Sequence, residues 1–269
     1  MLSPNWVSCS VPAFPLDLQD TAYSYLERPN VVLTSLLDKH VLRATPDARV
    51  LDIGCGCGAN ARELRGMAPR AHLVGIEPSP QAAELARQQG FDEVHESDAL
   101  SWLHASKAAP FQAVVLSDVL EHIADPVAML RELAQAEPLR DATWVISVPN
   151  YAVWYNRVRT LLGRFNYQWS GLFDRTHLRF FTRRSISELL GYCGFDVIED
   201  RATPALAQSA APLLRRMFES DLAEGNHLAL EESGSYRFYN KAVQPLEIKV
   251  CQLWPEMLGF QIVSVARVR

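Results

Sequence analysis

Apolar and polar positions follow a regular order along the first 150 residues. Short runs rich in Val, Ile and Leu predict buried strands, and apolar residues at helical spacing predict helices between them. The predicted strands lie near residues 48–53, 71–77, 92–96, 112–117 and 143–148, and the predicted helices near 20–26, 31–42, 59–67, 80–89 and 126–136. This alternation implies an α/β fold with a parallel sheet and helices on both faces.

The last third of the chain is less regular. A segment over 151–182 precedes a predicted helix near 184–192 and two predicted strands over 195–199 and 260–267, and residues 205–256 are interpreted as an insertion or cap. We expect a single domain over residues 1–269. It consists of an N-terminal helical arm or lid (1–45), a core (46–150) and a C-terminal segment (151–269).

Composition narrows the class of protein. With 269 residues, of which 48% are hydrophobic, the chain can bury one large core. A formal net charge of -5 disfavours a general nucleic-acid binder. The chain has no apolar run of membrane-spanning length, and its five cysteines are scattered. We therefore expect a cytoplasmic protein with free thiols and no nucleic-acid or membrane partner.

A glycine-rich turn follows the first predicted strand of the core, in the run VLDIGCGCGAN over residues 50–60. Gly54 and Gly56 let the backbone approach a ligand closely, and the next helix offers free N–H groups. With Ala59 they also satisfy a dinucleotide fingerprint, so an NAD-type cofactor is an alternative. Asp52 would repel a pyrophosphate there. It favours a cationic cofactor such as S-adenosylmethionine, which has an ammonium group, a sulfonium centre and no phosphate.

Cysteine spacing in the same turn first suggests a metal. Cys55 and Cys57 form a C-x-C pair, but no second cysteine or histidine pair completes a set of four ligands. We interpret both as small residues that fill the loop, and we predict no metal site.

Polar residues also end the next three predicted strands, at Glu77, at Asp98 and Ala99, and at Ser117. In this order they resemble the class I S-adenosylmethionine-dependent methyltransferases over residues 48–150. The resemblance implies a Rossmann-like, seven-stranded, mostly parallel sheet flanked by helices, whose last strand is antiparallel between its neighbours. It also implies the cofactor-binding residues Asp52, Gly54, Cys55 and Gly56 at the methionine end, Glu77 and Pro78 at the ribose, Asp98 and Ala99 at the adenine, Ser117 near the sulfonium and Tyr25 in a lid.

Simpler structural roles exist for several of these residues. The glycines can serve tight packing, Glu77 can be an exposed strand end, and Asp98 can cap the helical stretch over 99–105. Tyr25, like Tyr23, can be an ordinary half-buried aromatic residue.

Three segments are expected at the carboxyl ends of the strands, where open α/β sheets bind ligands. Residues 118–122 (DVLEH) resemble a motif of the ubiquinone-biosynthesis O-methyltransferases. Residues 174–182 (DRTHLRFFT) resemble a signature of methyltransferases from surface-glycan and secondary-metabolite clusters. Residues 147–150 (SVPN), with Trp154 and Arg157, resemble the methionine-biosynthesis protein MetW, which implies action through a partner.

A histidine is the natural base for a hydroxyl, phenol or ammonium group near neutral pH. His177 and His122 are the candidate catalytic residues, and a structural role is the alternative for each. Seven arginines lie between residues 151 and 184 against one acid, so this segment carries +6 and the rest of the chain -11. It suggests an anionic acceptor held by Arg175, Arg179 and Asn150, unless the arginines pair with acidic helices.

The sequence thus predicts a methyltransferase that converts S-adenosylmethionine to S-adenosylhomocysteine. The acceptor is predicted to be a small or carrier-bound anionic molecule, methylated at oxygen. A non-catalytic binding protein that regulates a partner enzyme is the alternative, and a homodimer is left open.

Overall fold

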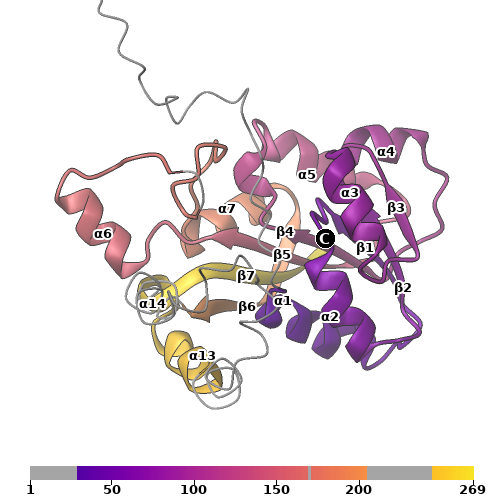
Figure 1. Cartoon of the computed structure of the whole chain (residues 1–269), viewed down its shortest axis with the longest axis horizontal. Helices are drawn as coiled ribbons and strands as arrows, with labels where there is room; N and C mark the ends of the chain where they lie inside the picture. The colour runs from indigo at the N-terminus through magenta and orange to yellow at the C-terminus, as the bar shows by residue number, and fades with distance from the viewer. Residues whose placement is uncertain (1–28, 169–170, 205–243) are drawn as a thin grey trace, which may run out of the picture.

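A computed structural model of the chain describes residues 29–168, 171–204 and 244–269 (Figure 1). Seven strands form one sheet in the order β3-β2-β1-β4-β5-β7-β6. Their bounds are β1 Arg49–Ile53, β2 His72–Ile76, β3 Glu93–His95, β4 Ala113–Ser117, β5 Thr143–Pro149, β6 Phe195–Pro204 and β7 Gly259–Val268. The first five strands pair in parallel, and β7 runs antiparallel to both β5 and β6. The predicted seven-stranded, mostly parallel sheet is confirmed.

The central strands form the middle of the hydrophobic core. Four of the five residues of β1 and the first six of β5 are buried, as continuous apolar runs in parallel strands require. Asp52 interrupts this pattern near the end of β1, where it lies opposite Gly75 of β2 and Val115 of β4. Burying a carboxylate at this place costs free energy unless a proton or a bound cation neutralises its charge.

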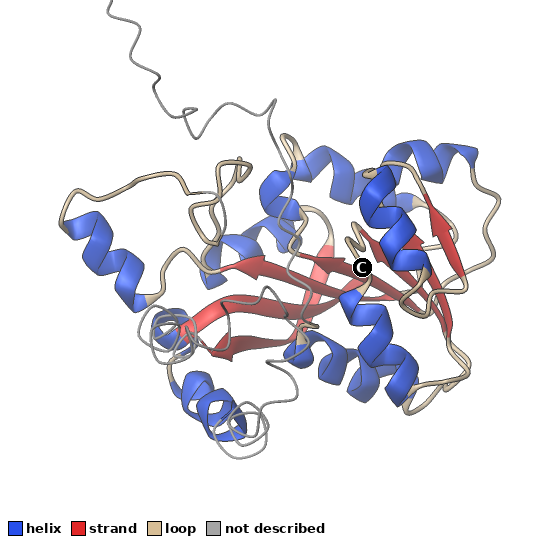
Figure 2. Cartoon of the chain, in the orientation of Figure 1, coloured by secondary structure: helices blue, strands red, loops and turns tan. Residues whose placement is uncertain are grey.

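Helices cover both faces of the sheet (Figures 1 and 2). One face packs against α4 (Ala99–Ala105), α5 (Pro126–Gln135) and α7 (Arg183–Tyr192), and the other against α1 (Val31–Leu37) and α2 (Ala59–Met67). The remaining α3 (Pro80–Arg87) lies beside β3 at the edge. Every helix predicted between residues 31 and 136 is present.

Side-chain caps explain where several helices begin. Asn30, Ser79, Asp98, Asp125 and Thr182 each accept a hydrogen bond from a backbone N–H in the first turn that follows. The predicted cap role of Asp98 is therefore confirmed. The helix predicted over 31–42 continues beyond α1 as a π-helical turn, Asp38–Leu42.

The segment after β5 is more ordered than its sequence predicts. It contains α6 (Trp154–Leu161), which stands away from both helix layers at the left of Figure 1. Two further helices, α13 (Gln244–Leu253) and α14 (Pro255–Leu258), lie in the predicted insertion and lead into β7. The rest of that insertion, the helix predicted over 20–26 and both tyrosines of the predicted lid lie outside the described residues.

None of the helices in the described part of the chain has the length and hydropathy that a membrane crossing requires.

Candidate functional site

The glycine-rich turn after β1 is tied to the neighbouring strand. The backbone N–H groups of Gly54 and Cys55 donate to the carbonyl of Ile76, at 2.8 and 3.0 Å. Gly54 has a φ of 72°, and a Cβ at this position would lie 2.6 Å from a methyl group of Val119. Glycine is needed here both for its backbone conformation and for the close approach of the loop after β4.

Two buried carboxylates, Asp52 and Glu77, lie under this turn at the ends of β1 and β2. Glu77 accepts hydrogen bonds from the N–H groups of Gly56 and Ser79, at 3.0 and 2.9 Å. Both carboxylate oxygens of Asp52 are buried without a hydrogen-bond partner. Burial raises the pKa of Asp52 to about 7, and the negative charge of Glu77 adds to the effect.

The loop cysteines do not form a reactive pair. Cys55 is buried with a free thiol, and burial raises its pKa far above the ordinary value. Its Sγ packs against Gly75, where a Cβ would lie 2.8 Å away. Cys55 therefore fills the space under the turn, as a small neutral residue does.

The predicted adenine residues lie at the start of α4. Asp98 is exposed, and one of its oxygens accepts from the N–H groups of Leu100 and Ser101, at 3.1 and 3.0 Å. Hydrogen bonds from Ser101 lower the pKa of Asp98. Ala99 is buried, and Pro78 is exposed after β2. The cap uses only one oxygen of Asp98, so it leaves the second for a ligand.

A second polar cluster follows β4. Ser117 lies with its Oγ 3.4 Å from the Oγ of Ser147 at the end of the neighbouring β5. Asp118 has a φ of 55°, unusual for a residue with a side chain. One of its oxygens accepts from the amide of Gln261 on β7, the other is buried without a partner, and burial raises the pKa of Asp118 to about 7.

Glu121 is the functional candidate that sequence reasoning missed. Only 1% of its surface is exposed, and neither carboxylate oxygen has a hydrogen-bond partner. Burial and the nearby Asp118 raise its pKa well above the ordinary value. Its backbone carbonyl accepts from the N–H groups of Leu178 and Arg179, at 2.7 and 3.0 Å. These bonds attach the segment 174–182 to the loop after β4.

The two predicted catalytic histidines meet through this attachment. The rings of His122 and His177 lie edge to face with centroids 4.8 Å apart. Nδ1 of His177 lies 3.1 Å from the carbonyl of Leu172, and Nδ1 of His122 lies 3.1 Å from Oγ1 of Thr176. Burial lowers the pKa of both, and His122 lowers that of His177 further. Both imidazoles are therefore neutral at pH 7.

The predicted acceptor residues differ in how their side chains are used. The amide of Asn150 donates to the carbonyls of Glu256 and Gly259, at 3.0 and 2.8 Å, and its oxygen accepts from Ala152. Asn150 thus joins the end of β5 to α14 and the start of β7, and no amide hydrogen of its side chain is left for an acceptor. Arg175 is buried, whereas the exposed guanidinium of Arg179 donates to the carbonyls of Leu178 and Ala124.

The arginines of the segment 151–184 differ in their partners. Arg183 pairs with Asp200 and Arg184 pairs with Glu188. Arg159 lies over the ring of Phe173, 4.6 Å from its centroid. Among the described residues, ion pairs with acids account for the last two arginines of the segment and not for Arg179.

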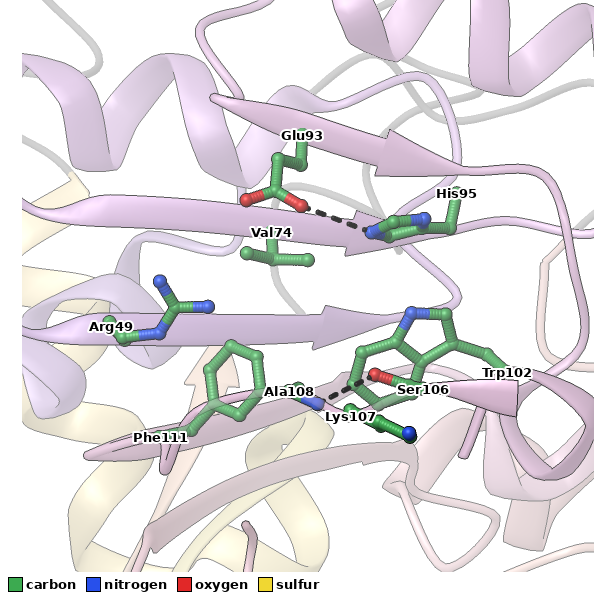
Figure 3. Close-up of a pocket in the computed structure, with 9 residues that line it drawn as sticks. All are labelled: Arg49, Val74, Glu93, His95, Trp102, Ser106, Lys107, Ala108 and Phe111. Carbon is green, nitrogen blue, oxygen red and sulfur yellow. Dashed lines mark hydrogen bonds and ion pairs between the residues drawn. The ribbon is translucent and has the colours of Figure 1, made fainter. Parts of the chain in front are cut away.

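A separate cavity of about 200 Å³ lies over β1, β2 and β3 (Figure 3). It is lined by Arg49, Val74, Glu93, His95, Trp102, Ser106, Lys107, Ala108 and Phe111. It shares no residue with the two polar clusters described above.

Comparison with known proteins identifies the family. Residues 25–200 match the family model described as a methyltransferase domain. The ubiquinone biosynthesis O-methyltransferase of Xylella fastidiosa (strain 9a5c) is 36% identical over 87 residues, which are 31% of this chain and 35% of that protein. The chain therefore spans about a third of the length of this relative.

Two solved structures share the fold. A SAM-dependent methyltransferase from Archaeoglobus fulgidus is 18% identical with a TM-score of 0.52, over 89% of this chain and 94% of that one. A putative sarcosine dimethylglycine methyltransferase from Galdieria sulphuraria is 14% identical with a TM-score of 0.54, over 88% and 84%.

The fold and the turn after β1 are those of a class I S-adenosylmethionine-dependent methyltransferase. The family match covers more than half of the chain, so the protein belongs to this methyltransferase family.

Proposed function

We propose that the protein transfers a methyl group from S-adenosylmethionine to an oxygen of a small or carrier-bound anionic acceptor. The observation that carries the cofactor assignment is the carboxylate of Asp52. It is buried beside a glycine turn, and neither of its oxygens has a hydrogen-bond partner. A cationic ligand offsets that cost, whereas a pyrophosphate increases it.

The residues around the turn fit S-adenosylmethionine. Asp52 with Gly54 and Gly56 would hold the methionine end, Glu77 the ribose, and Asp98 the adenine. Hydrogen bonds from the N–H groups of Gly56 and Ser79 hold the carboxylate of Glu77 at the end of β2, and a carboxylate accepts the hydrogens of ribose hydroxyls. When bound, the cofactor supplies an electrophilic methyl group on a sulfonium centre.

The histidine pair supplies a proton acceptor on the other side of the site. Nδ1 of His177 can only donate to the Leu172 carbonyl, so Nε2 is the basic nitrogen of that ring. A neutral imidazole takes the proton of an acceptor hydroxyl as the oxygen attacks. The buried Arg175 and the exposed Arg179 supply positive charge to an anionic acceptor. Methylation at oxygen is also the reaction named for the ubiquinone-biosynthesis relatives.

Calorimetric titration with S-adenosylmethionine and with NAD tests the cofactor. We expect S-adenosylmethionine to bind and NAD not to bind. Loss of a charge-assisted contact in Asp52→Asn should weaken binding by roughly 1.5 to 3 kcal/mol. Asp196→Asn is the matched control, because Asp196 pairs with Arg269 at the far end of β6. Binding of NAD alone would overturn the proposal.

Turnover is tested separately, by formation of S-adenosylhomocysteine with a panel of acidic hydroxylated acceptors. Cofactor binding without turnover, together with a changed activity of a partner enzyme that co-purifies, would instead support the non-catalytic alternative.

A further inference from the structure

Glu121, His122 and His177 form a cluster, and the proposed base role of His177 does not account for the buried carboxylate of Glu121. One potential ligand atom from each of the three lies within 4.8 Å of the others. The residues come from two segments, 118–122 after β4 and 174–182 after α6, which backbone hydrogen bonds to Glu121 join.

The hydrogen bonds of the His122 and His177 rings leave Nε2 of each ring as the nitrogen that can bind a metal. The hydroxyl of Thr176 donates its one hydrogen to Asp174, at 2.7 Å, so it can only accept from Nδ1 of His122. Nδ1 of His177 donates to a carbonyl. Each ring therefore carries its hydrogen on Nδ1 and keeps the Nε2 lone pair. Ligand histidines in metal sites are oriented in this way, by a hydrogen bond from the second nitrogen.

The carboxylate of Glu121 is an independent sign of a missing partner. It is 1% exposed, and neither oxygen accepts a hydrogen bond. Asp118 contributes a second negative group nearby and has a buried oxygen without a partner. Burying an acid in this way costs free energy unless a proton or a cation neutralises it.

We propose that Glu121, His122 and His177 bind one divalent transition-metal cation, of the Zn²⁺, Co²⁺ or Mn²⁺ kind. Two imidazoles and one carboxylate suit these ions better than Mg²⁺ or Ca²⁺, which prefer sets of oxygen ligands. With bonds of about 2.1 Å, tetrahedral ligands lie about 3.4 Å apart, so closure requires side-chain movements of about 1 Å. Three protein ligands leave a position open to an oxygen of a ligand.

This site bears on the proposed acceptor chemistry but does not rest on it. A bound cation would lower the pKa of an acceptor hydroxyl and occupy the same Nε2 lone pairs that otherwise take its proton. The ligand role and the base role of His177 therefore exclude each other in any one molecule. Cation binding is measured without cofactor or acceptor, so failure of one proposal does not decide the other.

The experiment is a titration of the metal-free full-length protein with Co²⁺, Zn²⁺ and Mg²⁺, followed by the visible absorption of bound Co²⁺ and its displacement by Zn²⁺. We expect one equivalent of Co²⁺ and Zn²⁺ to bind at pH 7.5. Affinity should fall as pH decreases and the histidines become protonated. Glu121→Gln and His177→Ala should each weaken binding at least tenfold.

The matched control is His72→Ala, because His72 lies beside Glu93 and Asp92 on the exposed edge of the sheet and is the best competing surface chelate. It should bind Co²⁺ as the parent does. Glu121→Gln preserves shape and removes a buried charge, so we expect it to fold, and denaturant unfolding checks this. Loss of binding in His72→Ala alone, preference for Mg²⁺, or no stoichiometric binding would overturn the proposal.

Discussion

Single residues of the proposed cofactor side could be named from the sequence because they lie on predicted strands or in the turns that directly follow them. Asp52 and Gly54 share a strand and its turn, and Glu77 ends the next strand. The burial of Glu121 could not be predicted, because it depends on a segment more than 50 residues later that covers it. Gln261 of β7, which donates to Asp118, has no local signal either.

His177 allows a prediction at this scale. Replacing it with Ala should lower turnover by roughly 10² to 10⁴ and leave the affinity for S-adenosylmethionine unchanged. Burial lowers the pKa of His177 in the parent, so it stays neutral to more acidic pH than an exposed histidine. The kcat of the parent should therefore fall at a more acidic pH than the titration of an exposed histidine would predict.

The pH-rate profile of the parent and the turnover of His177→Ala check this role. His104→Ala is the control, because His104 is exposed and pairs with Glu132 on the helix layer. Near-normal turnover of a folded His177→Ala protein would show that the ring is structural.

At the level of elements, alternation of apolar strands and amphipathic helices was sufficient to predict the parallel sheet, whereas the antiparallel β7 was predicted from the resemblance to class I methyltransferases. Each of these elements buries a continuous apolar face, which leaves a clear pattern. α6 does not bury its apolar side chains in this way. Trp154, Val158 and Leu161 are all more than a third exposed, so little of this helix is specified by packing against the core.

The segment 174–182 carries the next prediction. If it holds an anionic acceptor, Arg179→Gln should raise KM severalfold, and KM should also rise with ionic strength because salt screens exposed charges. Affinity for the cofactor should not change. Arg184→Gln is the control, since Arg184 is exposed and paired with Glu188 within α7.

Steady-state kinetics at low and high salt measure both effects. Arg175→Gln probes the buried arginine, with a melting curve to confirm that the variant folds. A KM that is independent of salt and of both substitutions would assign these arginines to structure alone.

At the scale of the whole molecule, buried acids gather at the carboxyl ends of the central strands β1 and β4. Asp52, Asp118 and Glu121 all have a raised pKa because of burial. Other acids have a lowered pKa. Glu199 is an example: its pKa is about 2, it lies near the surface of the fold, and it pairs with Lys39 and Arg201. The sequence shows the number of acids, but only the packing of the complete fold separates these two groups.

This separation predicts how stability depends on pH. An acid whose pKa is raised in the native state stabilises that state below its unfolded pKa, and the contribution is lost as pH rises through the native value. Asp52 and Asp118 titrate near 7 in the native state and are fully ionised in the unfolded state above pH 6. The free energy of unfolding should therefore decrease between pH 5.5 and 7.5, by about 2 kcal/mol for each group, and change little at higher pH, where both states are ionised.

Urea unfolding of the ligand-free protein at pH 5.5, 6.5, 7.5 and 8.5 measures this decrease. Asp52→Asn should be more stable than the parent at pH 8.5 and should show a smaller pH dependence, whereas Asp196→Asn should follow the parent. Saturating S-adenosylmethionine should stabilise the parent more at pH 8.5 than at pH 6.5, because its ammonium group interacts with the ionised carboxylate. A stability that is constant over this range, or equally steep in Asp52→Asn, would show that Asp52 is neutralised within the protein and is not held ready for a cation.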